Sequence, residues 1–259
     1  MDGCAVNTGI HNGALRLAEV KLGQSVQHVI CGLHLVELLF WHILSEVDGV
    51  TKGPDSFSGP VGSTITHNIW EEPVVAFLPI SGEVSELPDA VVKDLSRDQK
   101  LGYRYAHAIQ SGVMPDDLVG QAIGPMITSR WNTAAVRVMC KYKRTRNPTR
   151  KLVRLIKAVL RLYFPGWFRF KCNPHIQAGA KNYFYLVGLT KELEEKDMLV
   201  AQRVLQTNAH WPHQENVIIS MLSDGREEVR RRAVLYIMRA RRQLTPDNQP
   251  RQFVPPEVN

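Results

Sequence analysis

Residues 118–191 contain no Asp or Glu, yet they carry 15 Lys and Arg residues. The whole chain has a net charge of +7, because residues 1–117 carry a net charge of −8 and residues 118–259 carry +15. Solvated helix faces usually mix charges of both signs, since a face of one sign repels itself. We therefore predict that the folded chain keeps a basic surface for a polyanion, above all a nucleic acid, with an anionic membrane surface as the alternative.

Composition narrows the class of protein. The 259 residues suit one large domain or two small ones, and a content of 44% apolar and 22% charged residues excludes a wholly disordered chain. No apolar run reaches the roughly 18 residues of a membrane-spanning helix, and the N-terminus lacks the features of a signal peptide. Four cysteines in a chain of this length do not make a disulfide scaffold, so we expect a reducing compartment. Motifs for nucleotide cofactors and for serine hydrolases are absent from the sequence.

The spacing of apolar residues predicts a mostly helical protein. Asn7 is expected to cap a first helix that ends before Gly23, residues 26–30 to form a short buried strand, and residues 31–46 to form a buried helix. Ser96 is expected to open a helix that ends at Gly112. From there on, breaks that contain Pro or Gly separate a series of expected helices, at 127–143, 149–164, 174–189, 192–208, 213–223 and 225–243.

These elements predict an α+β chain that is mostly helical, in four parts. The parts are a partial α/β segment at 1–46, a loop-rich connector at 47–94, a helical domain with a basic surface at 95–244, and a disordered tail at 245–259. Within the connector, Gly, Pro and Ser mark a long loop at 48–62, and residues 74–80 are a strand or an extended segment. The tail contains four prolines and no periodicity.

Four residues make a candidate metal site. Cys31 and His34 form a Cys-x-x-His pair at the start of an expected helix, and this spacing puts both side chains on one face. Two ligands do not hold zinc, but His210 and His213, also three residues apart, are the natural second half of a tetrahedral set. The alternative is a buried cysteine beside a hydrogen-bonded helix histidine. A structural zinc on these residues is thus one of two interpretations.

The helix that follows Thr149 carries a stripe of basic side chains opposite an apolar face. Such a helix can lie along phosphates while its apolar face joins a core, or it can lie on a membrane or bind a partner protein. We predict nucleic-acid contacts for this stripe and for the residues before it: Arg130, Trp131, Lys141, Lys143, Arg144, Arg146, Arg150, Arg154, Lys157 and Arg161. For Trp131 the alternative is an aromatic anchor in the core. A second run of arginines, at 226–242, is more simply a solvated amphipathic helix.

Three segments carry a resemblance to a known family. Asp2, followed by a helix, a strand and a helix, has the position that an RNase H-like nuclease gives to one of its metal-binding carboxylates. Asp2 with VNTG, CGLHLVEL at 31–38 and TSRWNTA at 128–134 together resemble the hAT superfamily of DNA transposases. Further stretches resemble a multi-copy group of animal proteins over nearly the whole chain: DGVTKGPDSFSGPVG, LSRDQK, PGWFRFK and HQENVIISMLSDG.

The resemblance implies a partial RNase H-like core that runs into a helical insertion, in a nuclear protein that acts on transposon ends by a DDE mechanism with two Mg²⁺ ions. Asp2 would match the second acid of that triad. In such enzymes the first acid lies upstream of the position of Met1 and the final Glu lies beyond the helical insertion. No motif selects one of the nearest candidates for that Glu, which are Glu215, Glu227 and Glu228. The resemblance also favours the zinc interpretation, because some similar recombinases share a zinc between a Cys pair and two distant histidines.

We therefore predict a truncated, transposon-derived, nuclear protein that binds DNA and lacks catalysis by itself, with a homo-oligomer as a further expectation. Its expected metals are a structural zinc, and Mg²⁺ only where a full catalytic core exists. Two alternatives stay open. One is a helical module that binds an acidic partner or a membrane surface. The other is an active DDE nuclease that missing segments or a partner chain would complete.

Overall fold

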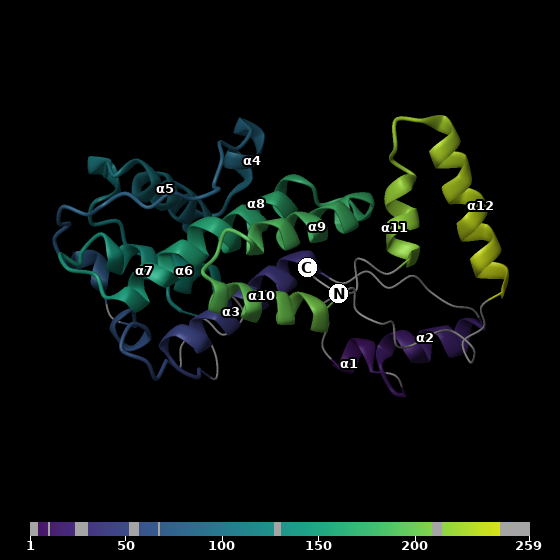
Figure 1. Cartoon of the computed structure of the whole chain (residues 1–259), viewed down its shortest axis with the longest axis horizontal. Coiled ribbons are helices and arrows are strands. Elements are labelled where there is room, and N and C mark those ends of the chain that lie inside the picture. The colour runs from purple at the N-terminus through teal and green to yellow at the C-terminus, as the bar shows by residue number, and fades with distance from the viewer. Residues whose placement is uncertain are drawn as a thin grey trace. The chain divides into compact units, whose positions relative to one another are not determined.

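The computed structural model describes residues 5–9, 11–23, 31–51, 57–66, 68–126, 131–208 and 214–243. These residues form helices joined by loops, and none of them is in a strand (Figure 1). The chain divides into two units that are discontinuous in sequence: unit 1 takes 1–35, 173–187 and 205–259, and unit 2 takes 36–172 and 188–204. Within the described ranges, every helix is too short or too polar to span a lipid bilayer.

The mostly helical class is confirmed, but the partial RNase H-like α/β core expected at 1–46 is not supported. The described residues of that stretch form only helices, α1 (Ala5–Thr8), α2 (Ala14–Leu22) and α3 (Gly32–Asp48). The expected strand at 26–30 lies outside the described residues, which also contain no second strand that it could pair with. The first helix is divided near Gly13, and α2 ends at Gly23, whose φ of 65° is left-handed.

Helix α6 (Trp131–Tyr142) lies at the centre of unit 2, because its residues are buried on every side except at Lys141. Helix α5 (Arg97–Ser111) packs along α6. The predicted ends of α5 are confirmed: Ser96 and Gln99 form a capping box, and Gly112 follows the last turn with a φ of 77°. Helix α3 adds buried apolar side chains to this core, at Leu39, Phe40, Ile43 and Leu44.

A helical segment of three parts runs from residue 150 to residue 172. It consists of α7 (Arg150–Ala158), the π-helical turn η4 (Val159–Tyr163) and α8 (Phe164–Cys172). The sequence predicts a break at Pro165, but the helix continues because a wider turn precedes the proline. Pro165 has no N–H for the Leu160 carbonyl five residues earlier, and this carbonyl instead accepts the N–H of Glu83 at 2.9 Å.

The segment that contains Glu83 is extended, as expected for 74–80, but it pairs with helix ends and not with a strand. Val75 donates its N–H to the carbonyl of Lys143 just after α6, and Ile80 donates to the carbonyl of Ile109 in the last turn of α5, each at 3.1 Å. The last carbonyls of a helix have no partner within the helix, so these bonds satisfy them. The other elements of this part of the chain are short: η1 (Gly62–Thr64), η2 (Ile69–Glu71), α4 (Asp89–Asp94) and η3 (Asp116–Leu118).

The remaining helices follow the predicted series. They are η5 (Ile176–Ala178), α9 (Gly179–Thr190), α10 (Glu195–Thr207), α11 (Gln214–Met221) and α12 (Glu227–Gln243). In unit 1, α11 contacts both η5 and α12, and Figure 1 shows α11 and α12 side by side. Ala233 of α12 is completely buried. The expected tail at 245–259 lies outside the described residues.

Asp48, the last residue of α3, closes the loop that the sequence predicts at 48–62. Its carboxylate accepts the N–H of Val61 at 3.0 Å and the N–H of Gly62 at 2.6 Å. These donors belong to the start of η1, where N–H groups lack helical partners and attract a negative charge. Gly59 passes so close to this closure that a Cβ on it would overlap the main-chain oxygen of Asp48.

We predict that Gly59→Ala lowers the free energy of unfolding by about 1–3 kcal/mol, because the added methyl group forces the loop away from Asp48. Urea unfolding followed by circular dichroism measures the change. Gly188→Ala is the matched control: Gly188 lies in α9 with open space around it, so alanine there should stabilise by up to about 1 kcal/mol. Equal midpoints for Gly59→Ala and the unmodified chain would contradict the steric argument.

Candidate nucleic-acid interface

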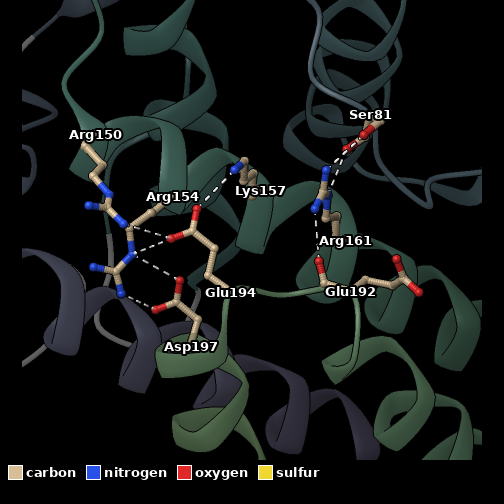
Figure 2. A network of polar contacts seen from close by, with 8 residues as sticks. All are labelled: Ser81, Arg150, Arg154, Lys157, Arg161, Glu192, Glu194 and Asp197. Carbon is tan, nitrogen blue, oxygen red and sulfur yellow. Dashed lines mark hydrogen bonds and ion pairs between the residues drawn. The ribbon is translucent and has the colours of Figure 1, made fainter.

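The basic stripe expected after Thr149 is present on one side of α7 and η4. We use this name for Arg150, Arg154, Lys157 and Arg161. Figure 2 shows that the stripe faces acidic residues that come from the connection between α9 and α10 and from the first turn of α10. The fold thus places a row of carboxylates beside the row of cations, and much of the charge of the stripe is neutralised within unit 2.

Arg154 and Asp197 form the most buried ion pair of this network. Two guanidinium nitrogens donate to the two carboxylate oxygens at 2.6 and 3.2 Å, the two-pronged geometry that suits arginine. The Asp197 side chain is 3% exposed and the Arg154 side chain 17%. Hydrogen bonding to Asp197 raises the pKa of Arg154, so the guanidinium stays charged. Asp197 also lies in the first turn of α10, where the helix dipole favours an acid.

Glu194 connects three cations of the stripe. Its carboxylate is 3.0 Å from Lys157 Nζ and 3.8 Å from both Arg150 and Arg154. The hydrogen bond from Lys157 lowers the pKa of Glu194. Arg161 donates instead to main-chain oxygens, those of Ser81 at 3.1 Å and of Glu192 at 3.0 Å.

We predict that Asp197→Ala lowers the free energy of unfolding by up to about 3–5 kcal/mol, because it leaves the mostly buried Arg154 guanidinium with only the more distant Glu194 carboxylate, at 3.8 Å, as a counter-charge. Urea denaturation measures the change. Glu194→Ala serves as the comparison, since its side chain is 35% exposed and the cost of an exposed pair is about 1 kcal/mol or less. An Asp197→Ala effect as small as that of Glu194→Ala would contradict a structural role for this pair.

Lys143, which the sequence assigns to a phosphate surface, is completely buried. Its Nζ lies 3.3 Å from the centre of the Tyr105 ring and 3.7 Å from the sulfur of Met114. Desolvation lowers the pKa of Lys143 to about 7, although the face of an aromatic ring favours the charged amine. Assignment of Lys143 to a phosphate surface does not fit this fold, because its side chain does not reach solvent.

The neighbours of Lys143 in the predicted patch are also engaged within the fold. Arg144 is 7% exposed and donates to the carbonyl oxygens of Glu72 and Trp70 at 2.7 and 2.9 Å, so it does not fit a phosphate surface either. Lys141 Nζ lies 3.7 Å from the carboxylate of Glu72, and its side chain is partly exposed. Arg144 and Lys141 thus hold the chain around η2 against the end of α6.

We predict that Lys143→Met raises the free energy of unfolding at pH 7 and flattens its dependence on pH. The pKa of Lys143 is about 7 in the folded chain, whereas in the unfolded chain it has the ordinary lysine value of about 10.4. Because the unfolded chain binds more protons in this window, the free energy of unfolding rises with pH across it, by up to about 5 kcal/mol in all. Below pH 7 the cost of burying the charged amine is fully present.

Urea midpoints between pH 6 and pH 9.5 test this dependence. Lys151→Met, at an exposed position of α7, is the matched control and should leave the slope unchanged. Identical slopes for Lys143→Met and the unmodified chain would show that Lys143 is not titrated in this range.

Trp131 is a core anchor, which is the alternative that the sequence left open. Its ring stacks with Trp41 at a centroid distance of 6.0 Å and meets Phe40 and Phe57 edge-on at 6.3 and 6.2 Å. Its N–H, the first of α6, donates to the Glu37 carboxylate at 2.8 Å. The position of Trp131 is therefore set by packing on α3, and its ring is not offered to a base.

Three cations at the start of α7 lie at the surface, and we call them the basic corner: Arg146, Arg150 and Lys151. The Arg150 side chain is 88% exposed, with Glu194 as a partner only at 3.8 Å. Thr149 caps the helix there by accepting the N–H of Leu152. The positive end of the helix dipole adds to the charge of the corner. The sequence reasoning missed Lys151 because it lies off the stripe, and its helical position beside Arg150 was the available signal.

The other predicted site residues are only partly described. Asp2, Arg130, His210 and His213 lie outside the described residues, while Cys31 is an exposed free thiol at the start of α3 and His34 is half-buried. Across the described ranges, no three His, Cys, Asp or Glu side chains are grouped closely enough to hold a metal ion. The zinc site, which needs both halves, and the catalytic role of Asp2 stay predictions.

Comparison of the chain with protein-family models, with curated proteins and with solved structures finds no match.

Proposed function

We propose that this chain is a transposon-derived nuclear protein that binds nucleic acid through its basic helical region. The observation that carries the proposal is the basic corner, where Arg146, Arg150 and Lys151 are exposed within six residues at the start of a helix. Phosphate groups bind to Lys and Arg side chains and to helix N-termini. We place the main phosphate contact at this corner, and not along the whole basic stripe, because carboxylates already occupy the stripe.

A contact between two motif segments supports the transposon origin. Glu37 belongs to the CGLHLVEL segment and Trp131 to TSRWNTA, and their hydrogen bond joins residues 94 positions apart. The stacking of Trp41 on Trp131 extends the same contact. This packing agrees with a common origin, and it assigns no catalytic role to either segment.

We predict that replacing the three residues of the basic corner with alanine weakens binding to duplex DNA by about 10- to 100-fold at low salt. The reason is that the variant has no charge-assisted phosphate contacts at this corner. Fluorescence anisotropy at several salt concentrations measures the affinity. The slope of the logarithm of the binding constant against the logarithm of the salt concentration should become shallower by up to about 3. Each lost phosphate contact removes about one released counterion from this slope.

The control replaces three exposed lysines elsewhere, Lys21, Lys93 and Lys181, and so removes the same net charge. If both triple variants weaken binding equally, the corner is not the contact. Anionic vesicles and an acidic polypeptide are tested alongside, because preferred binding to either favours the interaction-module alternative. Divalent-metal-dependent nicking that Asp2→Ala abolishes would favour the active-nuclease alternative.

A further inference from the structure

The amine of Lys143 is buried between two elements, and the described contacts of its Nζ include no carboxylate. Helix α5 presents the face of the Tyr105 ring, with its centre 3.3 Å from Nζ, and the loop after α5 presents the sulfur of Met114 at 3.7 Å. Glu72, on the segment that packs against the end of α6, instead lies beside Lys141. A charged amine at this position has therefore lost its water without gaining a counter-charge.

The other titratable groups around the amine do not neutralise it. Tyr105 and Cys140 are completely buried, and burial raises the pKa of each, so both are neutral at pH 7. Arg144, the next residue along the chain, is charged and repels a protonated amine. Desolvation, followed by the charge of Arg144, lowers the pKa of Lys143 to about 7. The charged neighbour thus adds to the cost of a proton on Lys143.

Met114 belongs to a loop that is a thinner cover than helix α5. The loop runs between Gly112 and Gly120, whose φ angles of 77° and 75° are left-handed, so both ends make turns that suit glycine. Met114 is partly exposed and Val113 is 67% exposed, whereas Tyr105 on the other side of the amine is completely buried. The shortest way from the amine to water therefore leads past Met114.

We propose that Lys143 and Met114 form a proton-operated latch: protonation of the amine opens the loop at 113–116 while the rest of unit 2 stays folded. The charged amine regains water once Met114 moves aside, which removes the desolvation cost. Asp116, two residues after Met114, is an exposed carboxylate that the opened loop offers to the amine as a counter-charge. Local openings of this kind cost less free energy than unfolding of a whole unit.

Contacts on both sides of the latch confine the opening to this loop. Beyond residue 116, Leu118 is completely buried, and Asp117 binds the Arg104 guanidinium at 2.7 Å. On the other side, the main-chain carbonyl of Lys143 accepts the N–H of Val75 at 3.1 Å, a bond that does not involve the amine. Movement of the amine thus leaves these contacts in place.

The direction of the pH dependence follows from the two states of the amine. In the open loop the amine is solvated and has the ordinary lysine pKa of about 10.4, whereas the pKa of Lys143 in the closed loop is about 7. Opening therefore takes up a proton. As the pH falls from about 10 to about 7, the open fraction rises by up to about tenfold for each pH unit, and below pH 7 it levels off.

Oxidation of the methionines by hydrogen peroxide, followed by mass spectrometry of peptides from the full chain, measures the opening. Between about pH 9 and pH 7 we expect the rate at Met114 to rise at least about tenfold, with a plateau at lower pH. Met238, which is 48% exposed, is the internal reference and should react at a constant rate. Met139, completely buried in α6, reports on unfolding of unit 2 and should stay protected.

Two results overturn the proposal. One is a rate at Met114 that, relative to Met238, does not change with pH. The other is oxidation of Met139 in step with Met114, which would show that unit 2 unfolds as a whole.

Lys143→Leu then tests whether this amine is the group that takes up the proton. The variant has no charge to solvate, so Met114 should react at pH 7 as slowly as it does at high pH. Lys151→Leu, at an exposed position of α7, is the matched control and should keep the profile of the unmodified chain. An unchanged profile in Lys143→Leu would show that another group drives the opening, and the latch would be wrong.

Discussion

The acid-free stretch of the chain obtains its counter-charges from sequence on both sides of it, and unit 2 depends on this exchange. From the N-terminal side, Glu72 lies beside Lys141 at 3.7 Å and Asp94 beside Lys171 at 2.6 Å. From the C-terminal side, Glu194 and Asp197 meet the basic stripe (Figure 2). Each of these pairs joins helices or loops that are distant in sequence. Most of this stretch of one sign is therefore neutralised by acids from elsewhere in the chain, and the basic corner is the exception.

This exchange explains which predictions from the sequence were correct. The ends of α5 were predictable, because the signals of Ser96 and Gly112 act on the backbone within a few residues. The spacing of the basic stripe was predictable for the same reason. Its partner was not, because Asp197 is 43 residues from Arg154 and no periodicity connects them. The break expected at Pro165 was wrong, since the repair comes from Glu83, which only the folded chain brings near.

The candidate site could also be predicted only in part, because the position of its cations is a local signal while their burial depends on long-range contacts. Charge counts identified the basic region but did not separate surface cations from internal ones. Lys143 and Arg144 follow α6, where the chain turns inward, and they became part of the core beneath the extended segment. Arg146 and Arg150 lie only a few residues further on and are exposed. Burial, which the linear sequence does not encode residue by residue, thus decides which cations remain free to bind a ligand.

The ion pairs of Glu194 and Asp197 also limit how far a polyanion bound at the basic corner can extend along α7. Glu194 lies 3.8 Å from Arg150 and is about one-third exposed, so it presents a negative charge at the border between the corner and the rest of the stripe. A phosphate that advanced from Arg150 toward Lys157 would have to displace this carboxylate, and Arg154 is held by the buried Asp197. Displacement of Glu194 gives up ion pairs that a phosphate would only replace, and Arg154 stays bound to Asp197, so an advance along α7 adds little binding energy. We therefore expect a nucleic acid bound at the basic corner to follow Arg146 and Lys151 and not the axis of α7.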